Sequence, residues 1–154
     1  MTGFWRTWMT AWCWAVAAFG LVITGAAFEA TSGPVRLLFA VLNGPEPLDL
    51  NAQMRFSEAV LGAVTLGWGV TLMAATQAAN LLGDRGRPVW GMITASVVVW
   101  YVVDSGLSIA TGYGLNALPN TAFLAAFLLP ILRSGVLGSG AGATGPRLPS
   151  SSGA

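Results

Sequence analysis

Long apolar stretches, separated by short polar or glycine-containing segments, dominate this chain. A helix needs about 20 mostly apolar residues to span the hydrocarbon core of a membrane. Four stretches are long enough, and they cover residues 8–28, 57–82, 88–110 and 117–137. A helical lead-in from Asn51 precedes the second stretch, and Pro130 interrupts the fourth. The pattern predicts an all-α fold, a four-transmembrane-helix antiparallel bundle, within a membrane domain of residues 1–137.

Two segments fall outside these spans. The apolar run at residues 34–43 is too short to span, and Pro34 suits the first position of a helix while Asn43 suits its end. We expect a short interfacial helix across the outer mouth of the bundle, acting either as a simple connection or as a lid. Residues 138–154 are rich in Gly, Ser and Pro, which predicts a disordered cytoplasmic tail.

The placement of arginine predicts the orientation of the spans. Five arginines lie in the N-terminus, in the loop between the second and third spans, and in the tail, and they are Arg6, Arg85, Arg87, Arg133 and Arg147. Only Arg36 and Arg55 lie on the other side. Because arginine is enriched in cytoplasmic loops, we expect a multi-pass protein of the bacterial inner membrane with both termini in the cytoplasm.

The composition supports a lipid environment. Only 8% of the 154 residues are charged, whereas 55% are hydrophobic, and the mean hydropathy is +0.68. A soluble domain carries about 25% charged residues. So few charges cannot cover the surface of a protein surrounded by water, so the lipid bilayer is the first partner that we expect. Assembly with a second copy or with another membrane protein is also possible.

Missing residue types exclude several kinds of chemistry. The chain has no His, its basic residues are all Arg, and Cys13 is its single cysteine. The lack of His removes the commonest metal ligand, and the lack of Lys removes Schiff-base chemistry. One cysteine excludes an internal disulfide and a thiolate metal cage. The net charge of +1 gives no electrostatic footprint for nucleic acid. We therefore expect no metal, no cofactor and no nucleic-acid partner.

Four tryptophans lie in the first turns of the first helix, and they are Trp5, Trp8, Trp12 and Trp14. The first three fall within about 60° of one another on a helical wheel. We interpret them as an aromatic belt at the cytoplasmic interface. A stacking platform for a ligand and a cleaved signal peptide are the alternatives, although the segment has no convincing A-x-A cleavage site.

The second span carries two lines of residues along its length. One line is small and partly polar, and it consists of Glu58, Gly62, Thr65, Gly69, Thr76 and Asn80. The other consists of small residues at every fourth position, and it includes Ala59, Ala63 and Gly67. Small residues at this spacing let helix backbones approach closely. We predict that Ala59, Ala63 and Gly67 form a close helix–helix contact, whereas packing alone does not explain Glu58.

Asp104 lies in an otherwise apolar part of the third span. A charge at the centre of a membrane costs about 2.5–3.5 kcal/mol on insertion scales, and it usually faces a cavity or a partner. Glu58 begins the second span on the same outer side, so both acids lie at similar depth on antiparallel neighbours. Arg55 is the nearest partner for either acid. We therefore predict one outward-facing polar cluster, with candidate ligand-binding residues Glu58, Asp104, Arg55, Ser108, Asn120 and Tyr101.

Polar and small residues continue from Asp104 at intervals of four residues, through Ser108, Gly112, Asn116 and Asn120. Gly112, Gly114 and Pro119 mark a turn in this series. We interpret Asn116 as a helix cap, whereas Asn120 is free to point into the bundle.

This series, D-S-x-x-S-x-x-x-G-x-x-x-N-x-x-x-N, together with LGWG in the second span, resembles a group of small bacterial four-helix integral membrane proteins of unknown function. The resemblance covers roughly the last three spans. It supports the four-helix architecture and points to residues 66–69, Asp104, Ser105, Ser108, Gly112, Asn116 and Asn120. It implies no activity.

Two functions from different classes fit these observations. The first is a protein with an outward-facing polar pocket that binds or transports a small ligand or a proton. The second is a structural or accessory membrane subunit, in which the acids form a buried ion pair with Arg55 and the small line of the second span mediates assembly. An enzyme is disfavoured, because no nucleophile–base pair, metal cluster or phosphate loop is visible.

Overall fold

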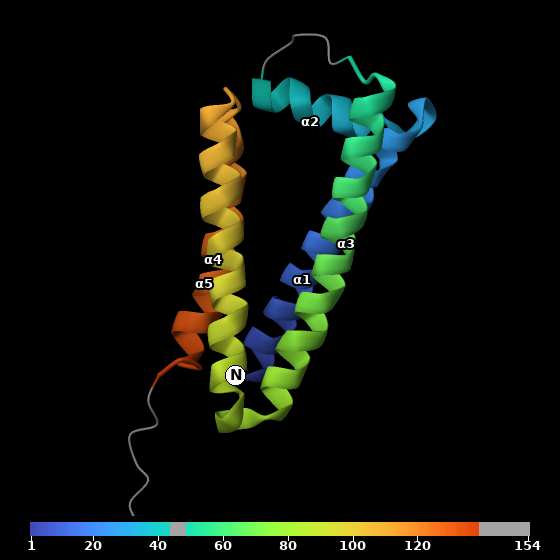
Figure 1. The fold of residues 1–154 in the computed structure, drawn as a ribbon. Helices are drawn as coiled ribbons and strands as arrows, with labels where there is room; N and C mark the ends of the chain where they lie inside the picture. The colour runs from blue at the N-terminus through green and yellow to red at the C-terminus, as the bar shows by residue number, and fades with distance from the viewer. Residues whose placement is uncertain (44–48, 139–154) are drawn as a thin grey trace, which may run out of the picture.

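The computed structural model describes residues 1–43 and 49–138 (Figure 1). Four long helices account for most of this part, and they are α1 (Gly3–Thr24), α3 (Ala52–Leu81), α4 (Arg87–Ala110) and α5 (Ala117–Ser134). The shorter helix α2 spans Gly33–Asn43. Short 3-10 helices lie between them, and they are η1 (Gly25–Ala27), η2 (Glu29–Thr31), η3 (Gly83–Gly86) and η4 (Gly114–Asn116).

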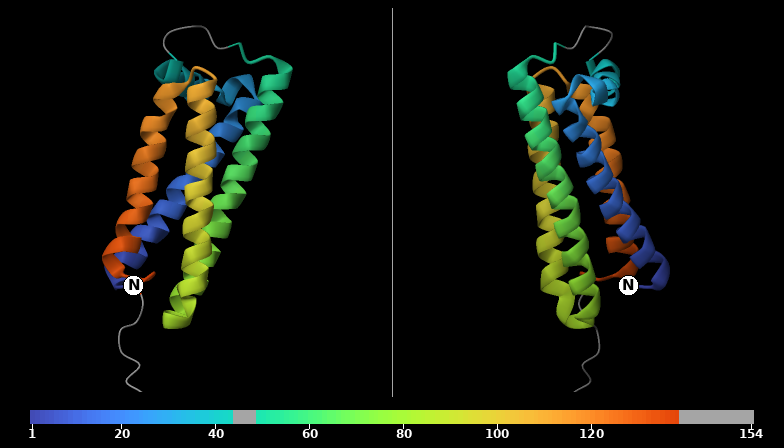
Figure 2. Two further views of the ribbon diagram at one scale, coloured as in Figure 1. Left: turned by 60° about the vertical axis from the view of Figure 1, so that its left-hand side comes forward. Right: turned by 90° about the vertical axis from the view of Figure 1, so that its right-hand side faces the viewer.

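The long helices form an antiparallel bundle. Around the bundle the order is α1, α3, α4 and α5, with α5 packed back against α1 (Figure 2). Helix α2 lies across one end of the bundle, opposite the end at which the N-terminus lies (Figure 1). The predicted all-α four-helix bundle with a short helix across one end is confirmed.

The surface of the bundle supports the prediction of a lipid environment. Four helical segments are long and apolar enough to cross a membrane, and they cover Gly3–Ala27, Ala52–Leu81, Gly83–Ala110 and Gly114–Ser134. Large apolar side chains on each long helix point outward and stay exposed, for example Leu21, Val64, Val102 and Leu132. Exposed apolar side chains in this number are typical of a multi-pass membrane protein.

Helix boundaries differ from the predicted spans mainly at the two ends of the bundle domain. Helix α1 begins at Gly3, five residues before the predicted start, because a helix continues past the apolar stretch that first signals it. Helix α5 ends at Ser134, where Gly135 adopts a left-handed φ of +63°. Asn51 begins α3 by accepting a hydrogen bond from the backbone N–H of Met54 at 3.0 Å. The predicted disordered tail lies, apart from Gly138, outside the described residues.

Helices α1 and α3 approach so closely that glycine is required at their contact. A Cβ atom on Gly69 would lie 2.7 Å from the backbone nitrogen of Ala17, and one on Gly20 would lie 2.8 Å from the carbonyl oxygen of Gly62. A Cβ on Gly62 would clash with the backbone of Thr24. Gly62 and Gly69 both belong to the line headed by Glu58, so this line is the one that packs against α1.

On the other line of α3, Ala59, Ala63 and Gly67 do not make the close contact that we predicted for them within the chain. A Cβ atom on Gly67 would meet nothing within 4 Å, and both Ala63 and Gly67 are exposed. Ala59 is only partly buried. Both lines of α3 contain small residues, so the spacing alone did not distinguish the line that faces α1 from the line that faces outward.

Tryptophans of α1 connect this helix to α5. The indole Nε1 of Trp8 donates a hydrogen bond to the carbonyl oxygen of Ala126 at 2.9 Å, and that of Trp12 donates to Phe123 at 3.0 Å. Pro130 lies inside α5 and has no N–H to bond the carbonyl four residues earlier, which is that of Ala126. The Trp8 indole therefore supplies the donor that Pro130 removes.

Large apolar side chains fill the half of the bundle near the N-terminus. This core cluster includes Met9, Cys13, Leu72, Trp90, Val97 and Phe127. They come from the early turns of α1 and α4 and from the late turns of α3 and α5, which antiparallel packing brings to the same end. The half of the bundle beneath α2 is built differently, because it contains a partly open cavity.

Candidate functional site

A cavity of about 600 Å³ lies between the α1–α3 pair and the α4–α5 pair, with α2 across its end. Its polar lining includes Glu58, Thr65, Asp104, Ser108, Asn116 and Asn120. Its aromatic lining includes Trp12, Phe19, Trp68, Trp100, Tyr113 and Phe123. The cavity therefore combines a small polar cluster with broad apolar walls, which is the usual composition of a binding site for a small molecule.

Asp104 is the centre of the polar cluster. Its Oδ1 atom accepts hydrogen bonds from the Asn120 amide at 2.8 Å and from the Asn116 amide at 2.9 Å. The Ser108 hydroxyl donates to the same oxygen at 3.3 Å. Hydrogen bonds to a carboxylate are stronger than those between neutral groups, so these contacts hold Asp104 in one orientation and join α4 to the start of α5.

Further contacts complete this network. The Asn116 amide also donates to the Ser108 hydroxyl at 2.9 Å, and the Asn120 amide donates to the Ser105 hydroxyl at 3.3 Å. All three bonds to Asp104 reach Oδ1, and Oδ2 accepts none from residues 1–43 or 49–138. Because Asp104 lines the cavity, its carboxylate retains hydrogen-bonding capacity for a group that enters there.

The four-residue series of the sequence explains how this cluster forms. Asp104 and Ser108 lie one turn apart on α4, and Asn116 and Asn120 lie one turn apart at the start of α5. Gly112 has a φ of +91°, a conformation that favours glycine, and it lies in the turn between the two helices. The turn folds the series back on itself, so that its two halves face each other.

Glu58 lines the same cavity from α3, and it is partly buried. No hydrogen bond from another described residue reaches its carboxylate, in contrast to Asp104. The structure thus brings both acids of the predicted cluster, together with Ser108 and Asn120, to one cavity.

Arg55 and Tyr101 do not take the places that the sequence predicted for them. Arg55 forms an ion pair with Glu29 and donates to the carbonyl oxygen of Ala26 at 3.2 Å, and it does not line the cavity. The Tyr101 hydroxyl lies 3.1 Å from the Thr121 hydroxyl, also outside the cavity lining. Arg55 therefore pairs with Glu29, in the connection after α1, and not with either of the acids that we expected.

Glu29, in η2, connects this short helix with α2 and with α3. It binds Arg55 of α3, and its Oε1 lies 3.1 Å from Nη2 of Arg36 in α2. The hydrogen bond from Arg55 is the largest cause that lowers the pKa of Glu29 below its ordinary value, and the charge of Arg36 lowers it further. This ion-pair group ties α2 to the bundle next to the cavity. An aromatic contact between Phe39 in the middle of α2 and Tyr113 after α4, with ring centroids 6.0 Å apart, joins α2 to the other side of the bundle.

Asn116 is a cluster residue whose role the sequence analysis missed. We interpreted it as a helix cap, but its side chain makes no capping hydrogen bond at the start of α5. Its amide instead donates to Asp104. The strict four-residue interval from Asp104 was the available signal, and the structure gives it a physical meaning.

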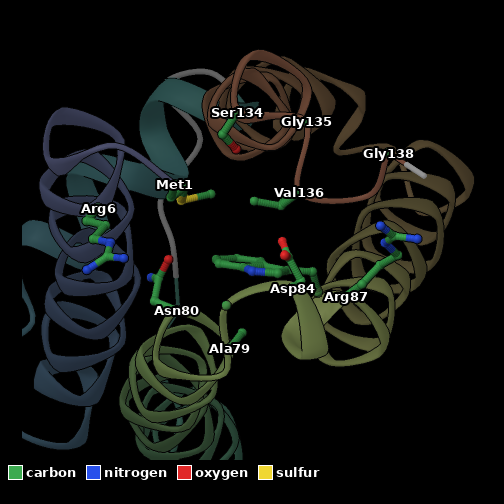
Figure 3. A pocket seen from close by; sticks show the side chains of 12 residues that line it. Met1, Arg6, Ala79, Asn80, Asp84, Arg87, Ser134, Gly135, Val136 and Gly138 are labelled. Carbon is green, nitrogen blue, oxygen red and sulfur yellow. The ribbon is translucent and has the colours of Figure 1, made fainter. Parts of the chain in front are cut away.

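A second pocket, of about 290 Å³, lies at the opposite end of the bundle (Figure 3). Arg6 and Arg87 lie on opposite sides of it, with Asp84 between them. The Oδ1 atom of Asn80, which also lines this pocket, is buried and has no hydrogen-bond partner among the described residues. Arg6 and Asp84, which line this pocket, are exposed.

The chemistry available at the cavity is hydrogen bonding at the polar cluster and apolar contact at the walls. Within the described ranges, no three His, Cys, Asp or Glu side chains gather into a group that would hold a metal ion. A carboxylate held by neutral donors can bind a hydrogen-bond donor or a positive charge, and the aromatic walls can bury an apolar group.

Comparisons of the chain with protein-family models, with characterised proteins and with solved structures find no significant match. The resemblance of the four-residue series to small bacterial four-helix membrane proteins therefore stays a prediction.

Proposed function

We propose that this protein is a small multi-pass protein of the bacterial inner membrane that binds or transports a small ligand or a proton through the cavity at Asp104. In this proposal both termini lie in the cytoplasm, and α2 lies on the outer side. The excess of arginine at the end of the bundle where α1 begins and α5 ends supports this orientation.

The observation that carries the proposal is the asymmetric bonding of Asp104. Three neutral donors hold Oδ1, while Oδ2 is left without a partner among the described residues. A carboxylate inside a membrane protein is costly and is usually retained for a function or a partner. A purely structural network would be expected to use both oxygens.

A structural role is the second candidate function. The exposed line at Ala63 and Gly67 supports it, because small residues at this spacing suit a close contact with another membrane helix. The buried ion pair that this role predicted between Arg55 and the two acids is absent, since Arg55 binds Glu29. This absence favours the binding or transport function.

Accessibility of the cavity tests the proposal. In a Cys13→Ala background, Ser108→Cys should react with a membrane-impermeant thiol reagent that is added to the outer side of intact cells. Ser105→Cys is the matched control, because Ser105 is buried on the same helix and does not line the cavity. If the reagent on the outer side labels neither cysteine, the cavity does not face outward. If Ser108→Cys is labelled only from the cytoplasmic side, the orientation of the protein is the reverse of the one proposed.

A further inference from the structure

The charged side chains that line the cavity, among the described residues, are all acidic. Glu58 and Asp104 line it, whereas none of its described lining residues is an arginine, and the chain has no Lys or His. The two arginines near this end of the bundle, Arg36 and Arg55, both bind Glu29 outside the cavity. The groups that bind Asp104 are neutral amides and a hydroxyl, which supply hydrogen bonds but no positive charge.

Charged groups inside a membrane protein are usually paired with an opposite charge. Among the described residues that line this cavity, the protein supplies two acids and no base. A ligand with a positive charge would compensate them, whereas an anion would meet two carboxylates in a medium of low dielectric constant. A neutral ligand would fill the space but would leave the charge of the acids without compensation.

The walls of the cavity suit a cation with an apolar body. The rings of Trp68 and Trp100 lie with their centroids 5.7 Å apart, on α3 and α4, and both line the cavity. Trp100 lies one turn before Asp104 on α4, so that ring and that carboxylate are on the same side of the helix. The faces of aromatic rings attract cations, most strongly for Trp and where water is excluded.

Size and composition exclude a bare metal ion as the best-fitting ligand. The cavity volume of about 600 Å³ is within the range of about 300–1,000 Å³ that is typical for drug-sized molecules. Hard metal ions require several oxygen ligands around one point, and most of this lining is apolar or aromatic.

We propose that the cavity binds lipophilic organic cations, with the cationic nitrogen beside Asp104 and the apolar body against the Trp68 and Trp100 rings. This inference depends on the proposed function, because it assumes that the cavity accepts a ligand. It adds the chemical class of that ligand.

A pair of probes with the same shape separates charge from apolar burial. One probe is a phenylalkyl trimethylammonium ion, and the other is its neutral analogue in which a tert-butyl group replaces the trimethylammonium group. Binding of each to the full chain in lipid nanodiscs is measured by quenching of tryptophan fluorescence and by equilibrium dialysis. Empty nanodiscs correct for partition into lipid.

We expect the cation to bind at least about tenfold more tightly than the neutral analogue. Asp104→Asn keeps the shape of the side chain, and it should weaken binding of the cation about tenfold while leaving the neutral analogue nearly unaffected. Glu58→Gln should also weaken binding of the cation. Glu29→Gln is the control, because it removes a carboxylate outside the cavity, and it should leave both affinities unchanged.

Three outcomes are informative. Preference for the cation that depends on Asp104 supports the inference. Equal binding of both probes overturns the cation class but keeps a ligand-binding cavity. No binding of either probe above the empty nanodiscs overturns the inference, while the labelling of Ser108→Cys from the outer side tests the proposed function separately.

Discussion

The half of the bundle near the N-terminus is filled with large apolar side chains, whereas the half beneath α2 contains a partly open cavity of about 600 Å³. Apolar filling holds all four helices together at the first end. At the second end, the helices are held mainly in pairs. Helix α1 meets α3 at Gly20 and Gly62, and α4 meets α5 through Asp104 and its amide donors.

This difference shows how a small membrane protein can keep an open space without losing its fold. In lipid, helices associate through close backbone packing and through hydrogen bonds between side chains. Each of these contacts joins the two members of one pair and requires no side chain in the space between the pairs. The filled half, together with the indole bonds of Trp8 and Trp12 to α5, then sets the distance between the pairs.

The largest effect is expected from removing a side chain of the filled half. Phe127 is fully buried in that core, and Phe127→Ala should lower the free energy of unfolding by about 3–5 kcal/mol, because it opens a new void. Phe123→Ala is the matched control, since Phe123 lines a space that already exists. It should cost less than about 2 kcal/mol. Equilibrium unfolding in mixed micelles measures both, and equal losses would contradict the comparison of the two halves.

A smaller but clear effect is expected at the contact between α1 and α3. Gly62→Leu should destabilise the protein by about 1–3 kcal/mol, because the added side chain meets the backbone of α1. Gly67→Leu on the same helix should change the free energy by less than about 0.5 kcal/mol, because nothing lies within 4 Å of its Cβ position. Thermal unfolding in detergent compares the two variants. A large effect of Gly67→Leu would show that its face contacts another helix, as the structural function requires.

The polar contact between α4 and α5 should be weaker than either of these. A double-mutant cycle of Asp104→Ala and Asn120→Ala should give a coupling energy of about 1 kcal/mol, since one charged hydrogen bond joins the two side chains. Asp104→Ala with Thr121→Ala is the control cycle, because the Thr121 hydroxyl pairs with Tyr101 instead. Its coupling should be close to zero. Similar coupling in both cycles would show that the network has no specific role in joining α4 to α5.

The smallest effect is expected at the ion-pair group beside α2. The pKa of Glu29 is lowered from 4.5, so its contribution to stability is present above pH 4.5 and is lost as the pH falls through the lower pKa of the folded state. Wild type should therefore be more stable than Glu29→Gln above pH 4.5, and the difference should disappear well below it. Denaturation of both proteins across this pH range measures it. A difference that does not depend on pH would mean that Glu29 contributes through its shape and not through its charge.

Several features of the site could be predicted because they depend on position along one helix. Glu58 and Asp104 were placed at similar depth from the direction of the chain, and both line the cavity. Asn120 was expected to point into the bundle, and its amide reaches Asp104. These inferences required only the helical period and the length of the spans.

Other features could not be predicted, because they depend on which element lies opposite a given face. Arg55 was expected to pair with the acids of the bundle, and the path of the chain after α1 brings Glu29 to it instead. Asn116 could cap its helix or bond across the turn, and the fold of the turn at Gly112 brings Asp104 within reach.

The sequence by itself determined the number of long helices, the short helix α2 and the all-α class, because a membrane requires about 20 apolar residues per span and satisfied backbone hydrogen bonds. Only the tertiary structure decided which of the two small lines of α3 packs against α1 and which groups bind Asp104. The helical period defines faces but not their neighbours, and two glycine-containing faces are equivalent until a second helix lies against one of them. In this protein Gly62 and Gly69 face α1, while Gly67 faces outward.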